Sequence, residues 1–224
     1  MRKFLPVLVL AACAGCGTGG EASRVERVPE SMRRPRVVAP KVLDRHLYAD
    51  VSKVRPGQWV TYKEAERTFT LAAVAAAGDA MWIEVIEEGD PRLVSARLVG
   101  PDGVVRKAFY GEIAKDGTKS TVEPQTLEQN GGTANGGLRE VSRETDEEKV
   151  ALPGRRELTA RRVSVRFEDL EGRLIREVTL WHKDVPPVYA GSDAGGLIRK
   201  TTATSTVDLV DFGTDAKPLL EIPR

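Results

Sequence analysis

Short runs that are apolar or that alternate between apolar and polar residues, separated by turn-forming residues, restrict the fold of this chain more than any other feature. Between residues 59 and 113 these runs are Trp59–Glu66, Thr68–Ala76, Ala80–Glu87, Arg92–Val99 and Val104–Ile113. Glycine, aspartate and proline separate several of them, and these residues favour tight turns. Strands this short and this closely spaced favour an antiparallel meander over a parallel α/β sheet, whose strands are separated by helices.

A second block of strands is expected from Leu158 onward. Apolar and polar residues alternate over 163–168, and a turn at Glu171-Gly172 leads into a further run, Leu174–Lys183. After a glycine-rich loop, a last β-prone segment covers Leu197–Phe212. Within it, the threonine and serine run Thr201–Thr206 suits an exposed or edge strand.

The sequence between the two blocks lacks this alternation. Residues from about 114 to 156 include two glycine pairs and an acid-rich stretch, which predict a flexible insertion or an interdomain loop. Before the strands, apolar residues recur at helical spacing over Pro40–Ser52 and predict one short helix. Residues 41–224 are therefore expected to be mainly β: an antiparallel curved sheet, sandwich or incomplete barrel, with one short N-terminal helix.

Composition limits the chemistry of the chain. The 34 lysines and arginines and the 33 acidic residues give a net charge of +1, which argues against a strongly basic nucleic-acid-binding protein. There are only two histidines and two cysteines, which is too few for the common zinc sites. We therefore expect no metal and no cofactor.

The sequence also predicts no catalytic residues and hence a non-enzymatic protein. Ser192, His182 and Asp184 include a nucleophile, a base and an acid, but no Gly-x-Ser-x-Gly motif surrounds the serine. Glu84 and Glu87 do not form a glycosidase pair, because their odd spacing on an alternating strand places them on opposite faces.

The first residues have the layout of an export signal. Arg2 and Lys3 precede the apolar run Phe4–Ala12, and both cysteines of the chain, Cys13 and Cys16, follow it. A helix needs about 20 apolar residues to cross the hydrocarbon core of a bilayer, so this run is too short for a permanent span. A positive start, a short apolar core and small residues predict a signal peptide over residues 1–15.

Leu10-Ala11-Ala12-Cys13 resembles the lipobox of bacterial membrane lipoproteins, and Cys13-Ala14-Gly15-Cys16 is an overlapping second candidate. Cys13 has the better motif, whereas Cys16 gives the more usual signal length. The resemblance implies that one of the two cysteines is acylated and becomes the mature N-terminus. Two or three acyl chains hold a protein on a bilayer stably, at about 0.8 kcal/mol per buried methylene. The alternatives are a plain secretory signal and a cytosolic protein whose apolar start is a chance feature.

The resemblance also implies a location in the cell envelope. Neither cysteine is followed by aspartate, which retains many Gram-negative lipoproteins at the inner membrane, so the outer membrane is favoured, facing the periplasm. Residues 16–40 are polar and contain prolines, which predicts a disordered tether between the anchor and the folded domain. The excess of basic residues in this tether suits either contact with anionic headgroups or a solvated spacer.

Trp59, Trp82 and Trp181 each lie in an expected strand. They predict either core packing or the lining of an apolar ligand cavity in a cup-shaped sheet. The expected role is therefore non-catalytic binding of an apolar ligand or a protein partner at the envelope. A structural or assembly subunit of an envelope complex is the alternative. In architecture alone, such a domain is similar to the half-barrel domains of lipoprotein carriers and receptors.

Overall fold

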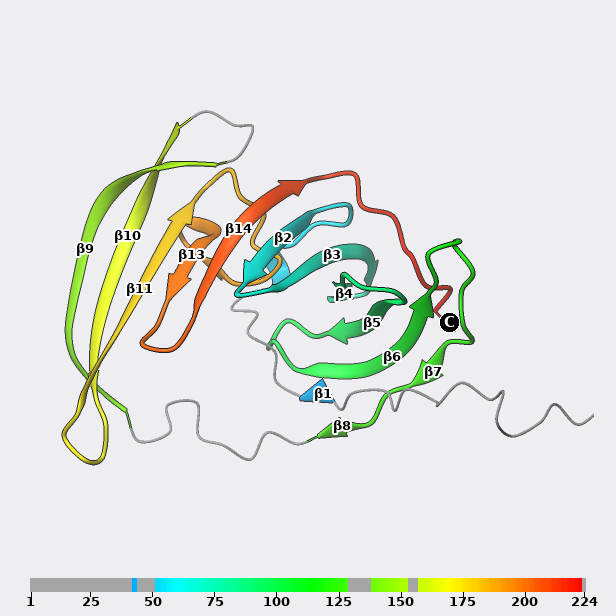
Figure 1. The fold of residues 1–224 in the computed structure, drawn as a ribbon, viewed down its shortest axis with the longest axis horizontal. Coiled ribbons are helices and arrows are strands. Elements are labelled where there is room, and N and C mark those ends of the chain that lie inside the picture. The colour runs from blue at the N-terminus through cyan, green and yellow to red at the C-terminus, as the bar shows by residue number, and fades with distance from the viewer. Residues whose placement is uncertain (1–41, 44–50, 129–137, 153–156, 223–224) are drawn as a thin grey trace, which may run out of the picture. The chain divides into compact units, whose positions relative to one another are not determined.

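The computed structural model describes residues 42–43, 51–128, 138–152 and 157–222 (Figure 1). These residues belong to one compact unit that is built almost entirely from strands. The one helical element among them is the 3-10 turn η2, Val51–Lys53. No helix in this part of the chain is long and apolar enough to cross a membrane. The predicted mainly β, antiparallel fold is confirmed.

The N-terminal half of the sheet is an antiparallel meander (Figure 1, cyan to green). Its strands are β2 (Trp59–Glu64), β3 (Arg67–Ala77), β4 (Ala80–Glu87), β5 (Arg92–Val99), β6 (Val105–Ile113) and β7 (Glu123–Pro124). Each strand pairs with the next one in the chain. The predicted runs match β2–β6 closely, because each run ends at residues that favour a turn over a strand.

The C-terminal half is a second antiparallel meander, and it continues the same sheet. Its strands are β9 (Arg139–Ala151), β10 (Glu157–Glu168), β11 (Leu174–His182), β13 (Gly195–Thr201) and β14 (Thr206–Gly213), with β12 (Gly191–Ser192) paired to β13. Because β14 pairs with β2, the two blocks form one open sheet of 12 strands with β7 and β9 at its edges. A separate parallel pair joins β1 (Val42–Leu43) to β8 (Leu127–Glu128).

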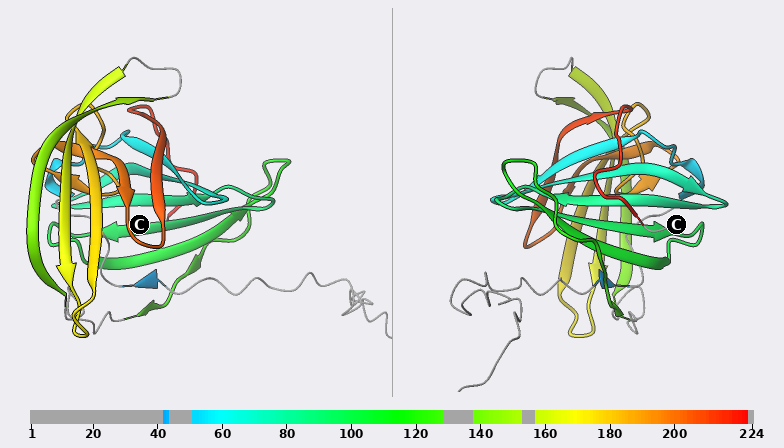
Figure 2. Two further views of the ribbon diagram at one scale, coloured as in Figure 1. Left: turned by 60° about the vertical axis from the view of Figure 1, so that its left-hand side comes forward. Right: turned by 90° about the vertical axis from the view of Figure 1, so that its right-hand side faces the viewer.

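One face of the sheet, here called the core face, carries the larger apolar cluster. Strands of both meanders contribute to it, and so do η2 and the loop after β11. In Figure 2 (left), β9–β11 run across the direction of β4–β6, so the sheet changes direction around this cluster. The largest fully buried apolar side chains are Tyr62, Leu71, Ile83, Leu180, Leu197 and Ile198. The core face is therefore filled by the chain's own side chains.

The opposite face, here called the tail face, carries a smaller cluster on β3–β5. It is covered by the segment that follows β14, residues 214–222, which we call the tail. Figure 2 (right) shows the tail, in red, crossing the strands of the N-terminal meander. The buried members of this cluster are Ala72, Val74, Ile86, Val94 and Ala96 of the sheet and Leu220 of the tail.

Tyr62 of β2 joins the two meanders across the core face. Its side chain is fully buried, and its hydroxyl donates a 2.8 Å hydrogen bond to the backbone oxygen of Leu197 on β13. Its ring also packs near those of Phe69 and Tyr189, with centroid distances of 5.9 and 4.9 Å. A buried hydroxyl needs such a partner, so the bond fixes the position of β2 relative to β13.

The helix predicted over Pro40–Ser52 is not seen. Val42–Leu43 is a short strand instead, and Val51–Lys53 is a single 3-10 turn. Residues 44–50 of the predicted helix lie outside the described residues, as do residues 1–41. Val51 packs into the core-face cluster, so contact with the sheet accounts for its burial.

The run Thr201–Thr206, predicted as an exposed or edge strand, spans the turn between β13 and β14. Both of these strands lie inside the sheet, so the edge assignment was wrong. The Thr202 hydroxyl accepts hydrogen bonds from the backbone N–H groups of Thr204 and Ser205, at 3.3 and 3.1 Å. Hydroxyl groups that bond to nearby backbone in this way compete with strand pairing and favour a turn.

Strand β9 lies within residues 114–156, where the sequence predicts a flexible insertion or an interdomain loop. Of its residues only Val150 is buried, and most of the others are charged and exposed. Several ion pairs connect it to β10; among them, Arg162 lies 2.9 Å from Asp146 and 3.3 Å from Glu148. A charged edge strand discourages pairing with other chains. Because its sequence does not alternate between apolar and polar residues, no strand was predicted there.

Candidate functional site

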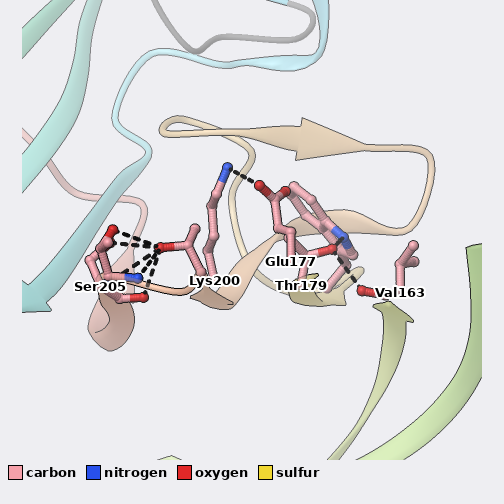
Figure 3. Close-up of polar contacts among 8 residues, drawn as sticks. Val163, Glu177, Thr179, Lys200 and Ser205 are labelled. Atoms are coloured by element: carbon pink, nitrogen blue, oxygen red, sulfur yellow. Dashed lines mark hydrogen bonds and ion pairs between the residues drawn. The ribbon is translucent and has the colours of Figure 1, made fainter. Parts of the chain in front are cut away.

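The structure places the three candidate tryptophans at two separate sites. Trp59 and Trp82 pack against the tail-face cluster, whereas Trp181 packs against the core-face cluster. The Trp181 indole N–H donates to the Thr179 hydroxyl at 3.0 Å, and that hydroxyl donates to the backbone oxygen of Val163 at 3.4 Å (Figure 3). Trp181 is therefore held by its own series of hydrogen bonds, in a different cluster from Trp59 and Trp82.

A groove lies beside Trp82 on the tail face. A row of directly paired residues crosses four strands there: Ala75 of β3 is opposite Trp82 of β4, Trp82 is opposite Leu98 of β5, and Leu98 is opposite Lys107 of β6. The register shift between Ala73 and Ala75 in β3 marks a bulge at the start of this row. Small alanines at this end of β3 leave space next to the indole.

The groove has a volume of about 730 Å³. This falls within the roughly 300–1,000 Å³ that is typical of small-molecule sites. The sheet supplies its floor and the tail supplies one wall, and the lining is mostly apolar. The lining residues are Val74–Ala77, Trp82, Leu98 and Lys107 from the sheet, and Pro218 and Leu220–Ile222 from the tail.

The start of the tail is attached near β2. The backbone N–H of Ala216 donates to the backbone oxygen of Gly57 at 2.8 Å. The Trp59 indole N–H donates to the Asp215 carboxylate, also at 2.8 Å. A Cβ at Gly213 would lie only 2.7 Å from Trp59 Nε1, so a side chain at this position would displace the indole. Trp59 therefore packs under the tail and anchors it.

Glu84 holds the middle of the tail. Its side chain is fully buried on β4, and its two carboxylate oxygens accept hydrogen bonds from the Leu219 backbone N–H, at 3.0 and 2.9 Å. One of these oxygens also accepts from the Leu220 N–H at 2.9 Å. Burial raises the pKa of Glu84, while the backbone hydrogen bonds and the positive charge of Lys119 oppose that shift.

Leu220 inserts into the sheet surface at a glycine. Its side chain is only 3% exposed, and a Cβ at Gly111 on β6 would lie 2.8 Å from its Cδ2 atom. Gly111 is directly opposite Val94 on β5, another member of the tail-face cluster. The absence of a side chain at Gly111 therefore provides the space that Leu220 fills.

The serine, histidine and aspartate considered as a triad lie near a second, more polar pocket. The Ser192 hydroxyl accepts from the backbone N–H of Ala194 at 3.0 Å, and His182 Nδ1 accepts from the backbone N–H of Asp184 at 3.2 Å. No hydrogen bond joins Ser192 to His182 in the described part of the chain. Ser192 and Asp184 line this pocket of about 400 Å³ together with Lys53 and other residues.

Among the described residues, no group of three or more histidine, cysteine, aspartate or glutamate side chains is placed to hold a metal ion. Cys13 and Cys16, the candidate lipidation sites, lie outside the residues that the structure describes.

Sequence reasoning missed the tail and the role of Glu84. The tail has no alternation and no strand, so no periodic signal marks it. Glu84 was considered only with Glu87, and the structure does place the two carboxylates on opposite faces, since Glu87 pairs with Arg67 at the surface. An acid in the middle of the apolar run Ala80–Ile86 was the available signal, because a buried charge needs partners.

Comparisons of the chain with protein-family models, curated proteins and solved structures found no match. Function is therefore inferred from the residues of the chain alone.

Proposed function

We propose that this protein is a lipid-anchored, non-catalytic protein of the bacterial cell envelope that binds an apolar ligand in the tail-face groove. The groove beside Trp82 is the observation that carries this proposal. Its lining is mostly apolar, with alanines, an indole, a leucine and apolar residues of the tail beside Lys107 and Glu221, and it includes no serine, cysteine or histidine. Such a lining suits burial of an apolar molecule better than nucleophilic catalysis.

The core face supports placing the ligand on the tail face. Because the core-face cluster is packed with the chain's own side chains, a ligand there would have to displace them. Of the expected architectures, an incomplete barrel fits this packing best, since one cluster collects side chains from both meanders of an open sheet. The cup of that barrel is filled, and the groove lies on its other surface.

The groove proposal is tested with N-phenyl-1-naphthylamine, an uncharged fluorophore that brightens in apolar sites. The full chain would carry Cys13→Ser and Cys16→Ser, so that no attached acyl chain competes with the probe. We expect Ala75→Trp to fill the groove and weaken binding at least about tenfold, or 1.4 kcal/mol. Ala77→Trp, at an exposed lining position on the same face of the sheet as Ala75, should act in the same direction.

The matched control for these variants is Ala151→Trp, which places the same indole at an exposed position on β9. This control should bind the fluorophore as the parent chain does. Unchanged binding by both Ala75→Trp and Ala77→Trp would place the ligand elsewhere, and a parent chain that does not bind N-phenyl-1-naphthylamine would contradict the proposed function.

The lipid anchor is tested separately by labelling cells with radioactive palmitate. We expect the chain to be labelled, and we expect only one of the variants Cys13→Ser and Cys16→Ser to lose the label. Membrane fractionation should find the labelled protein in the outer membrane. An unlabelled parent chain would rule out the lipoprotein assignment without affecting the groove.

A role as an assembly subunit is the second candidate, and exposed apolar side chains at one end of the C-terminal meander favour it. Leu170 is 86% exposed in the β10–β11 turn, and Leu174 and Val141 are 66% and 51% exposed. Val141 lies on the edge strand β9, and exposed apolar side chains of this kind favour contact with a partner. If this role holds, Leu170→Asp combined with Leu174→Asp should shift the protein from a larger complex to a monomer in native electrophoresis of membrane extracts.

A further inference from the structure

The proposed ligand groove is apolar along its floor and positively charged at one end. Its floor follows the paired row from Ala75 through Trp82 and Leu98 to Lys107. Neighbouring strands are about 4.8 Å apart, so three spacings give a track roughly 14 Å long. The track therefore leads from small alanines to an exposed ammonium group.

Lys107 differs from the arginines of the same meander. On β3–β6, Arg67 pairs with Glu87, Arg92 lies 3.5 Å from Glu88, and Arg106 lies 2.6 Å from Asp102. The Arg97 guanidinium donates to the Ser95 hydroxyl at 3.1 Å. Lys107 has no ion-pair partner within 4.0 Å among the described residues, although Glu221 lines the same groove. Its charge is thus open to a ligand.

We propose that the groove takes a free fatty acid anion, with its single acyl chain along the row and its carboxylate at Lys107. The inference rests on the proposed function and adds the class of ligand. The single row of apolar residues, closed on one side by the tail, has room for one acyl chain. The ammonium group of Lys107 at its end suits the single negative charge of a carboxylate. Glu221 is the acidic residue of the groove lining, and its negative charge disfavours an anionic ligand.

The inference is tested by calorimetric titration with decanoate and with decanol, which differ only in the head group. The full chain with Cys13→Ser and Cys16→Ser is used at pH 8, where a carboxylic acid is ionised. An exposed ion pair contributes about 0.2–1 kcal/mol, so we expect Lys107→Ala to weaken decanoate binding up to about fivefold. Decanol binding should not change.

Two further variants sharpen the test. Glu221→Gln removes the opposing charge and should strengthen decanoate binding while leaving decanol binding unchanged. Lys115→Ala removes another exposed lysine, located in the β6–β7 connection outside the groove lining, and should change neither titration.

Equal weakening of decanoate and decanol by Lys107→Ala would overturn the inference, because the lysine would then only shape the groove. Binding of decanol and N-phenyl-1-naphthylamine without binding of decanoate would overturn it as well. Both results leave the proposed function in place. That function fails if the parent chain does not bind N-phenyl-1-naphthylamine.

Discussion

At the residue scale, Glu84 is the most informative side chain of the tail face. A fully buried carboxylate is costly unless it is hydrogen-bonded, and the backbone amides of Leu219 and Leu220 supply those bonds. The same bonds satisfy two amides that the tail could not pair within a strand. One side chain thereby attaches a segment that has no regular structure of its own.

Glu84→Gln should loosen the tail. Glutamine keeps the shape of the side chain, but its NH₂ group would face backbone donors, so we expect a loss of about 1–3 kcal/mol in the free energy of unfolding. Hydrogen exchange should show faster exchange at the Leu219 and Leu220 amides. Glu87→Gln, on the same strand and the opposite face, is the control and should leave both amides protected. Unchanged exchange in Glu84→Gln would mean that other contacts hold the tail.

The contribution of Glu84 should also depend on pH. Burial raises its pKa above the ordinary value of 4.5, so the folded chain takes up this proton at a higher pH than the unfolded chain does. The part of the stability that comes from this raised pKa is therefore fully present below pH 4.5 and is lost as the pH rises through the folded-state pKa, whereas the hydrogen bonds to the tail remain. Urea unfolding should show the advantage of the parent chain over Glu84→Gln shrinking over that range. An advantage that grows with pH would contradict this sign.

Gly111 and Leu220 should be energetically coupled. Gly111→Ala places a Cβ against Leu220 and should cost about 1–3 kcal/mol through overpacking. Leu220→Ala removes a buried side chain and should cost about 2–5 kcal/mol. In the double variant the alanine at 111 meets no clash, so the combined cost should be smaller than the sum. Additive costs, measured by urea unfolding, would show that the two sites do not share space.

At the element scale, the tail behaves as a cover for one face of the meander and not as a part of the sheet. Its backbone bonds go to Gly57 and Glu84, and its only deeply buried side chain is Leu220. The core-face cluster contains no residue of the tail. The strands should therefore form without it.

Deletion of residues 215–224 should leave a folded β protein with an uncovered apolar face. We expect the far-ultraviolet circular dichroism to keep its β signal, while binding of an apolar dye rises because Ala72, Ile86 and Val94 become exposed. Deletion of residues 223–224 alone is the matched control and should behave as the full chain. Loss of the β signal on the longer deletion would instead make the tail part of the folding core.

Element prediction succeeded where local pattern and tertiary context agree. The runs that became β4 and β5 were placed from local pattern alone, since β5 alternates, β4 is a short apolar run, and turn residues lie at the ends of both. The same approach missed β9, because its stability comes from pairing with β10 and from ion pairs such as Arg162 with Asp146. It also missed the tail, since contacts distant in sequence determine its position.

At the scale of the whole molecule, the pairing of β14 with β2 makes one sheet from two meanders. Val207 and Leu209 of β14 share the core-face cluster with Val60 and Tyr62 of β2. A shared cluster of this kind couples the two halves, because neither can open without exposing apolar surface of the other. The two blocks should therefore unfold together.

Single-tryptophan variants test this coupling. A chain that keeps only Trp82 reports on the N-terminal meander, and a chain that keeps only Trp181 reports on the C-terminal meander. We expect the urea midpoint from fluorescence to match the midpoint from circular dichroism in each variant. A midpoint for Trp82 that differs from the circular dichroism midpoint of the same variant would mean that the halves unfold separately.

The sequence by itself determined the mainly β class and the strands from Trp59 to Ile113, because alternation and turn residues are local properties of the chain. It also predicted the signal peptide and the candidate lipidation residues Cys13 and Cys16, because these features lie in a short contiguous stretch of sequence. Only the tertiary structure decided that the two blocks share one sheet and that Trp59 and Trp82 lie apart from Trp181. It alone brought Glu84 to the tail and formed the groove, since these depend on contacts between residues more than a hundred positions apart.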